Sequence, residues 1–255
     1  MRRQDMYLEV KDLKKSYGEG GGYVQVLKGI NAGVEQGEMC VIQGTSGSGK
    51  STLAGLAARL YDASEGEVLI DGKNVKDYSF SGLYDKMGYV TQKAVLFSDT
   101  IEGNVAFGEA AQAITEEDVK KAIDISQAQE FIDKMEEGLY SHIAQSGGNV
   151  SGGQKQRLSI ARAIARNPEI LIFDDSFSAL DYKTDKELRR RLSTDLKSTT
   201  CVIVAQRIGT IRHADKIIVL DDGKMAGIGT HEELMKNCEV YRQIAMSQLS
   251  EEELA

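Results

Sequence analysis

The segment that most constrains the fold of this 255-residue chain is a glycine-rich stretch between two apolar patterns. Residues 44–51 read GTSGSGKS and fit the pattern GxxxxGK[ST] at every fixed position. A short apolar run at 39–42 precedes the stretch, and residues 50–60 place leucines on one face of a helix. We therefore expect a buried strand, a tight loop and an amphipathic helix, in that order.

Such a loop is suited to holding phosphate groups. Its glycines let backbone N–H groups turn inward, and the helix N-terminus adds about half a positive charge. Lys50 would neutralise phosphate oxygens, and the Ser51 hydroxyl would ligate Mg²⁺. The alternative is a glycine- and serine-rich loop without a ligand. A phosphate loop of this kind predicts a bound nucleotide. The residues predicted to contact it are Gly44, Thr45, Ser46, Gly47, Ser48, Gly49, Lys50, Ser51 and Thr52.

Strand and helix patterns alternate along most of the chain. The early residues 7–10 and 24–30 have strand-like patterns, and short apolar runs at 170–173, 201–205 and 217–220 are typical of buried strands. Helices are predicted over 119–132, 160–166 and 184–196. Strands that alternate with helices indicate a parallel sheet covered on both faces. Because residues 100–155 break the alternation, we expect a helical insertion there.

Composition and charge exclude several classes of protein. Hydrophobic residues make up 41% and charged residues 27% of the chain, which is typical of a globular domain. No apolar run approaches the roughly 20 residues that cross a bilayer, and residues 1–10 lack the apolar core of a secretory signal. The net charge of −8 argues against a general grip on nucleic acid. Cys40, Cys201 and Cys238 lack metal-binding spacing, so we expect reduced thiols in a cytosolic protein.

A second chemical motif lies further along the chain. Residues 170–175 read ILIFDD, an apolar strand that ends in two acids. Taken alone, this pattern equally fits a strand that runs into an acidic turn. Together with a phosphate loop upstream, it favours a carboxylate, that of Asp174, which binds Mg²⁺ either directly or through a bound water.

The most diagnostic segment is residues 150–157, VSGGQKQR. With the two preceding motifs, it makes the chain similar, over about residues 6–245, to the nucleotide-binding domain of ATP-binding-cassette (ABC) transporters. In that family this signature segment caps the ATP held by a partner subunit, so two cassettes dimerise head to tail around ATP. The resemblance assigns this capping role to Ser151, Gly152, Gly153 and Gln154.

The resemblance also implies a fold and a domain plan. The fold would be α/β, with the RecA-like core of a P-loop NTPase, a mostly parallel sheet and an N-terminal antiparallel β region. Residues 1–92 and 157–245 would form this core, and 93–156 an inserted helical subdomain that carries the signature. One ABC ATPase domain would thus occupy residues 1–245, followed by a tail at 246–255.

Several further positions match the family one at a time. Tyr17 matches the aromatic residue that stacks on adenine, with Tyr23 as its rival. Gln92 matches the glutamine that reaches Mg²⁺ or the attacking water, and it begins the segment that contacts the membrane partner. Residues 178–181 match the loop that crosses the dimer interface, and 140–148 match a segment that touches the coupling helices of exporters. The alternatives are an ordinary core or surface tyrosine and a solvated loop glutamine.

Two positions depart from the fully active form of the family. Asp175 stands where an active cassette has a glutamate that polarises water, and Gln206 stands where it has a histidine. The shorter carboxylate is set back by one methylene, and Gln206 cannot carry the charge of an imidazolium. We expect ATP binding with slow hydrolysis, as in the degenerate half of a heterodimeric exporter. The predicted catalytic residues are Asp175, Gln206 and Gln92, and the predicted metal ligands are Ser51, Gln92 and Asp174.

The resemblance is not uniform along the chain. Residues 13–17 and 26–30 are similar to free-standing cassettes of the macrolide-exporter and lipoprotein-release type, whereas the chain from about residue 61 resembles exporter cassettes fused to a membrane domain. A mosaic of two cassette types would explain this difference. An excised domain and a natural free subunit are the alternatives.

Three functions are compatible with these motifs. The first is an ATPase subunit that drives a membrane transporter from the cytoplasmic side, with ATP, a second cassette and a transmembrane domain as partners and no nucleic acid. The second is an ATP switch in translation or DNA repair, which the net charge of −8 disfavours. The third is a binding-only cassette, regulatory or engineered, without a transport partner.

Overall fold

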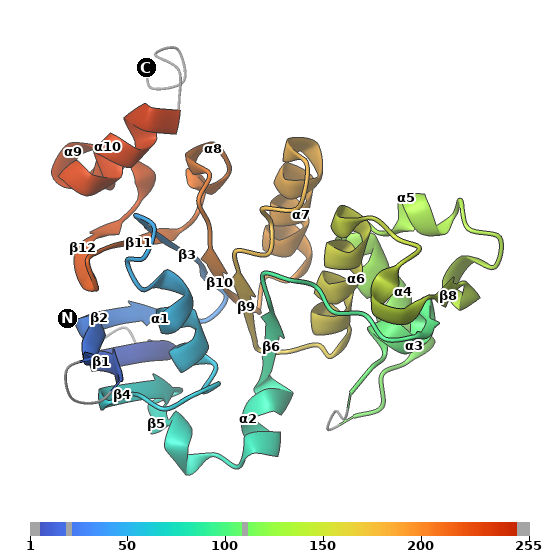
Figure 1. Ribbon diagram of the computed structural model, residues 1–255, viewed down its shortest axis with the longest axis horizontal. Helices are drawn as coiled ribbons and strands as arrows, with labels where there is room; N and C mark the ends of the chain where they lie inside the picture. The colour runs from blue at the N-terminus through green and yellow to red at the C-terminus, as the bar shows by residue number, and fades with distance from the viewer. Residues whose placement is uncertain (1–5, 19–21, 109–111, 249–255) are drawn as a thin grey trace. The chain divides into compact units, whose positions relative to one another are not determined.

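The computed structural model describes residues 6–18, 22–108 and 112–248, in which two compact units can be distinguished (Figure 1). The first unit comprises Met1–Leu83 and Thr200–Ala255, and the second comprises Tyr84–Thr199. The predicted helical subdomain, residues 93–156, lies within the second unit, which also contains two strands and a helix outside that range. Each unit is described in turn.

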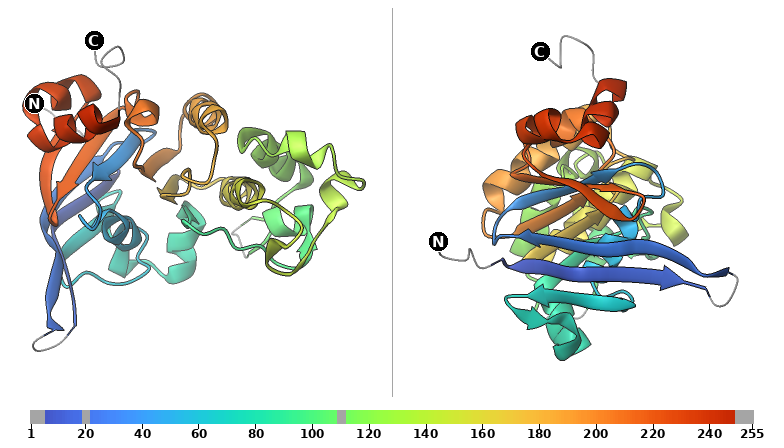
Figure 2. Two further views of the ribbon diagram at one scale, coloured as in Figure 1. Left: turned by 45° about the horizontal axis from the view of Figure 1, so that its top comes forward. Right: turned by 90° about the vertical axis from the view of Figure 1, so that its left-hand side faces the viewer.

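An antiparallel sheet forms the N-terminal part of the first unit. Its strand order is β2-β1-β4-β5, formed by β1 (Leu8–Tyr17), β2 (Val24–Val34), β4 (Glu65–Ile70) and β5 (Lys73–Asn74). Both β2 and β4 pair antiparallel to β1, and inward side chains such as Leu13 of β1 and Ile30 of β2 are fully buried. The right-hand view of Figure 2 shows these long strands running side by side.

Parallel strands make up the other sheet of this unit. The central strand β3 (Met39–Gly44) lies between β10 (Thr200–Val204) and β11 (Lys216–Asp221), and both neighbours run parallel to it. The last strand, β12 (Lys224–Gly229), pairs antiparallel to β11. All five residues of β10 are buried, which is why the sequence shows a continuous apolar run rather than an alternation. The mostly parallel sheet and the antiparallel region confirm the predicted fold class.

Helices cover both faces of these parallel strands. Helix α1 (Lys50–Ala57) packs against β3 and β10 and also against the antiparallel sheet. The opposite face is covered by α10 (Glu239–Gln248), which contacts α8 (Ile208–Ile211) and α9 (His231–Asn237). After β5, the short η2 (Val75–Asp77) is followed by α2 (Phe80–Lys86). The first segment of the first unit ends within α2, at Leu83.

The second unit is built on two parallel strands, β6 (Met87–Val90) and β9 (Ile170–Asp174). The long helix α6 (Gly152–Ala165) packs on β6 and on α3 (Ile101–Val105) and α4 (Glu116–Ile125), and α4 also contacts α7 (Tyr182–Asp195). The remaining elements are β7 (Asp99–Thr100), α5 (Gln129–Ile132), η3 (Gly138–Tyr140), β8 (His142–Ile143) and η4 (Gln145–Gly147).

Two helices end earlier than their sequence patterns predict. The predicted helix over 119–132 is wrong as a single helix, because Gln127 has a left-handed φ of 61° and separates α4 from α5. The Ser126 hydroxyl donates to the Ile123 carbonyl over 3.0 Å and so satisfies the end of α4. Similarly, α1 ends at Ala57, since Arg59 adopts a φ of 51°. After the break at Gln127 the apolar residues Phe131 and Ile132 of α5 are again buried, whereas Leu60, beyond the break at Arg59, is exposed.

Within the described residues, the structure contains no helix with the length and apolar character needed to span a membrane.

The three cysteines are free and buried in the first unit. Burial raises the pKa of both the Cys40 and the Cys201 thiols to about 12. Since the thiolate is the reactive form, and only about one such thiol in ten thousand is ionised at pH 8, both side chains are chemically protected.

We therefore predict that Cys40 and Cys201 do not react with a disulfide reagent such as Ellman's reagent at pH 8 in the native protein. In concentrated guanidinium chloride, where burial is lost, both should react together with Cys238. Peptide mapping of the labelled cysteines makes the measurement. Rapid labelling of either strand cysteine without unfolding would contradict the prediction.

Candidate nucleotide-binding site

The loop between β3 and α1 follows a path that requires glycine at its first position. Gly44 has a φ of 152°, and a Cβ atom there would lie 2.1 Å from the Leu220 carbonyl oxygen of β11. The strand pairing explains this crowding, because Leu220 is the register partner of Gly44. The predicted phosphate loop is thus pressed against β11 at its start, and its exposed part is residues 45–47.

The polar groups of this loop suit an anion. No side chain caps the N-terminus of α1, and its first turn carries no acidic residue, so the positive end of the helix is left for an external anion. The Lys50 ammonium donates to the carbonyls of Gly44 and Thr45 over 2.8 and 2.7 Å, which places the charge over the loop. The buried Ser48 hydroxyl has no hydrogen-bond partner among the described residues. This set of groups fits a phosphate.

An aromatic pair lies beside the same helix in the first unit. The Tyr17 ring is 44% exposed and meets the Tyr61 ring edge to face, with centroids 6.3 Å apart. The Tyr61 hydroxyl donates to the Thr52 carbonyl of α1 over 3.2 Å, and the Lys15 ammonium lies 5.0 Å from the centre of the Tyr17 ring. The rival Tyr23 is 62% exposed, and its hydroxyl accepts a hydrogen bond from Ser16. Tyr17 is therefore the tyrosine connected to the loop helix.

Gln206 follows β10 at the same end of the sheet as the loop. Val204 is the register partner of Ile42, so the chain leaves β10 where β3 approaches the loop. The Gln206 carbonyl accepts hydrogen bonds from the side-chain amides of Gln43 over 3.2 Å and Gln248 over 2.8 Å. Its side chain is exposed. The structure thus places Gln206 beside the residue that precedes Gly44.

The acidic strand end of the second unit is built by the parallel pairing of β6 and β9. Because Val90 is the partner of Phe173, the residues after both strands emerge at one edge. The Tyr89 hydroxyl donates to Oδ2 of Asp174 over 3.1 Å, and Nε2 of Gln92 donates to Oδ2 of Asp175 over 3.1 Å. Two of the predicted catalytic residues, Gln92 and Asp175, are therefore in direct contact.

Asp175 itself is held in an unusual conformation. It has a left-handed φ of 47° and is 7% exposed, and its carbonyl accepts a hydrogen bond from the Ser178 hydroxyl over 2.8 Å. Aspartate tolerates this backbone region better than longer side chains do, because its short polar group bonds locally. The loop at 178–181 that follows ends at Asp181, whose carboxylate caps the N-terminus of α7. The two hydrogen bonds to Thr184 lower the pKa of Asp181.

The signature segment forms the N-terminus of α6. Ser151 and Gln154 form a reciprocal capping box, in which the Gln154 amide donates to Ser151 Oγ over 3.3 Å and the Ser151 amide donates to Gln154 Oε1 over 2.8 Å. Gly152 is exposed, with open space where a Cβ would lie. The buried Gln156 donates to the Thr91 carbonyl over 3.1 Å, so α6 is tied to the loop that carries Gln92.

The predicted site residues are distributed over both units. The first unit holds the phosphate-loop residues, Tyr17 and Gln206, and the second holds Gln92, Asp174, Asp175 and the signature. The described residues contain no cluster of three or more His, Cys, Asp or Glu side chains suited to a metal ion.

Sequence reasoning missed three residues that support the site: Tyr89, Gln43 and Gln156. Each contacts a predicted residue or its immediate neighbour. The sequence signal that could have identified them is a polar residue beside a motif, within a strand or helix that is otherwise apolar and buried.

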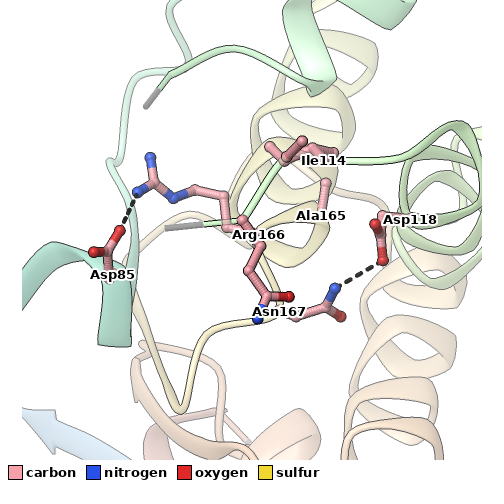
Figure 3. Close-up of a pocket in the computed structure, with 8 residues that line it drawn as sticks. Asp85, Ile114, Asp118, Ala165, Arg166 and Asn167 are labelled. Atoms are coloured by element: carbon pink, nitrogen blue, oxygen red, sulfur yellow. Dashed lines mark hydrogen bonds and ion pairs between the residues drawn. The ribbon is translucent and has the colours of Figure 1, made fainter. Parts of the chain in front are cut away.

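A cavity of about 240 Å³ lies elsewhere in the second unit, near the end of α6 (Figure 3). Two polar pairs line it: Arg166 lies 3.8 Å from Asp85, and the Asn167 amide donates to Asp118 over 2.8 Å. None of the predicted site residues lines this cavity.

Comparisons with known proteins agree with the fold and the motifs. The family model described as ABC transporter matches residues 27–178. The chain therefore belongs to the ABC transporter family, and it corresponds to the nucleotide-binding domain of that family.

Individual relatives extend this similarity along the chain. The ATP-dependent lipid A-core flippase of Hahella chejuensis is 41% identical over 244 residues, which are 96% of this chain and 41% of the relative. An uncharacterized ABC transporter ATP-binding protein of Mycobacterium bovis is 42% identical over 229 residues, 89% of this chain and 39% of the relative. The structure of a bacterial Atm1-family ABC exporter with ATP bound has a TM-score of 0.89 and 32% identity, and covers 98% of this chain and 43% of that one.

Two facts follow from these alignments. The chain spans about two fifths of the length of the relatives it matches. The alignments give no support to a mosaic of two cassette types.

Two glycines allow the role of the loop to be tested against a matched control. Gly47 in the loop and Gly72 in the turn between β4 and β5 have φ values of 76° and 73°, and a Cβ at either would meet open space. Alanine at either position should lower the free energy of unfolding by about 1 kcal/mol, because the backbone there is left-handed and alanine adopts that conformation at a cost. Only Gly47→Ala should weaken Mg·ATP binding, by about tenfold, since it alone distorts the phosphate loop.

Chemical denaturation and calorimetric titration of both variants make the measurement. Equal affinity in the two variants would contradict the prediction that the left-handed backbone at Gly47 shapes the phosphate site.

Proposed function

We propose that this chain binds Mg·ATP and pairs with a second cassette to drive a membrane transporter. The observation that carries the proposal is the loop after β3, which holds the Lys50 ammonium, the buried Ser48 hydroxyl and the uncapped N-terminus of α1 within a few residues of one another. Tyr17, exposed beside the same helix, would stack on the adenine ring, a contact worth about 0.5–1.5 kcal/mol beyond burial.

We further propose that Ser51, Gln92 and Asp174 hold Mg²⁺. Hydroxyl, amide and carboxylate oxygens are the ligands that this cation prefers, and when bound it would neutralise phosphate charge. Tyr89 supports this assignment, because its hydrogen bond fixes the orientation of the Asp174 carboxylate at the end of β9.

The signature is proposed to act on the nucleotide of a partner cassette. Ser151 begins α6 with its side chain and backbone already committed to the capping box, so the segment is ordered before a partner binds. Gly152 is exposed and leaves room for a phosphate to approach the backbone. Gly153 and Gln154 complete the same turn.

Hydrolysis at the chain's own phosphate loop is proposed to be slow. The Asp175 carboxylate is buried, shorter than glutamate, and bonded to Gln92, so it is poorly placed to orient an attacking water. Gln206 can donate a hydrogen bond but cannot supply positive charge. Binding groups are thus present, while water-activating groups are weakened, as in the degenerate half of a heterodimeric exporter.

The relatives support export as the direction of transport, because two of them are named as lipid A-core flippase and Atm1-family exporter. The cassette would then work at the cytoplasmic face of a membrane, beside a transmembrane domain. A binding-only cassette is the second candidate function, and it is favoured by the substitutions at Asp175 and Gln206. The two candidates differ in ATP turnover.

Calorimetry with two lysine variants tests the binding proposal. Lys50→Ala should abolish the heat of Mg·ATP binding, because it removes the only predicted side-chain cation of the loop. Lys134→Ala is the matched control, since this lysine forms an exposed ion pair with Glu130 in the second unit and should leave binding unchanged. A wild-type chain that gives no heat with Mg·ATP would refute the proposal.

Restoring the family residues tests the slow-hydrolysis proposal. The double variant Asp175→Glu, Gln206→His should bind Mg·ATP as the wild-type chain does but release phosphate about 100-fold faster, because a misplacement of ~1 Å at a reacting group can cost that factor. Steady-state phosphate release makes the measurement. If the wild-type chain is already as fast as the double variant, the degenerate-site proposal is wrong.

A further inference from the structure

The segment after β10 depends on a distant side chain for its backbone hydrogen bonds. Residues 205–207 belong to no helix or strand, and α8, which follows, begins without a side-chain cap from its own N-terminus. Instead, Oε1 of Gln248 accepts the hydrogen bond of the Ile208 amide over 2.9 Å. Nε2 of the same side chain donates to the Gln206 carbonyl over 2.8 Å. One side-chain amide therefore bridges two backbone groups on either side of Arg207.

This bridge restricts the backbone more than a single hydrogen bond would. A donor and an acceptor in one rigid amide plane fix both the position and the direction of the peptide they bind. The Gln206 carbonyl also accepts from Gln43, the buried residue before the phosphate loop, so the segment is held from β3 and from α10 together. The backbone of Gln206 is thus fastened between the strand that begins the loop and the last residue of α10.

The helix that carries Gln248 is itself firmly anchored. Tyr241 and Ala245 of α10 are fully buried, and the Tyr241 hydroxyl lies 2.8 Å from Nδ1 of His231 in α9. Helix α10 packs on β3 and β11, the strand pair that shapes the loop. Because α10 is held in place by this packing, the hydrogen bonds of Gln248 at its end can fix the position of the loop at residues 205–207.

We propose that Gln248 is a positioning residue for ATP hydrolysis, which acts by holding Gln206 in place. This inference rests on the proposed function, in which Gln206 takes the place of the family histidine and donates a hydrogen bond at the bound ATP. Gln248 does not contact the nucleotide. Its role is to restrict the Gln206 backbone. The Cα atom from which the Gln206 side chain extends is then held in one position.

Steady-state phosphate release from Mg·ATP by the full chain tests this role, at protein concentrations where specific activity no longer rises. Gln248→Ala removes both hydrogen bonds and should lower kcat about tenfold, as expected for a reacting group displaced by less than ~1 Å. The KM for ATP and the affinity for Mg·ADP should not change, because the phosphate loop is untouched. Gln243→Ala is the matched control, since Gln243 lies exposed on the same helix and its amide donates to Glu239, one turn earlier in α10.

A second variant separates positioning of Gln206 from mere capping of α8. Gln248→Glu keeps an acceptor for the Ile208 amide but loses the donor to the Gln206 carbonyl. If positioning is the role, Gln248→Glu is as slow as Gln248→Ala; if only the cap matters, it keeps the wild-type rate and the proposal is overturned.

A double-mutant cycle with Gln206→Ala completes the test. The effect of Gln248→Ala should disappear in that background, because the residue it positions is gone. An equal loss in both backgrounds would overturn the proposal. Failure of the proposed function is distinguishable, because it would appear as a wild-type chain whose nucleotide binding does not depend on Lys50.

Discussion

The pairing of β3 on both of its edges is the constraint on which the first unit depends. Parallel neighbours β10 and β11 satisfy its backbone, so the strand can be buried and can end abruptly at Gly44. Segments far apart in the sequence then meet at its carboxyl end: the phosphate loop, the residue Gln206 after β10, and Asp221, which accepts a hydrogen bond from Thr45. This is the edge at which parallel α/β sheets bind ligands.

In the second unit, too, parallel strands bring residues from distant parts of the sequence to one edge of a sheet. Two parallel strands, β6 and β9, deliver Gln92 and the acids Asp174 and Asp175 to one edge, and direct hydrogen bonds organise them there. Helix α6 is tied to that edge through Gln156. The signature at the start of α6 and the loop of Gln92 are therefore mechanically connected within this unit.

Asp175 and Gln206, the two residues predicted to slow hydrolysis, are both held by hydrogen bonds from other parts of their units. Asp175 occupies a left-handed backbone position suited to a short polar side chain, and its carboxylate has a partner in Gln92. The backbone of Gln206 is held by two glutamine side chains from different elements. Both residues thus belong to ordered local hydrogen-bond networks.

The sequence by itself determined the phosphate loop, the acidic strand end, the signature and the fold class, because each depends on a local pattern of glycines, charges or buried runs. It did not reveal the break at Gln127, which a left-handed residue imposes within a continuous helical pattern. Nor did it identify Tyr89 or Gln248. Only the tertiary structure decided these, because their roles arise from hydrogen bonds between residues far apart in the chain, and no periodicity records such contacts.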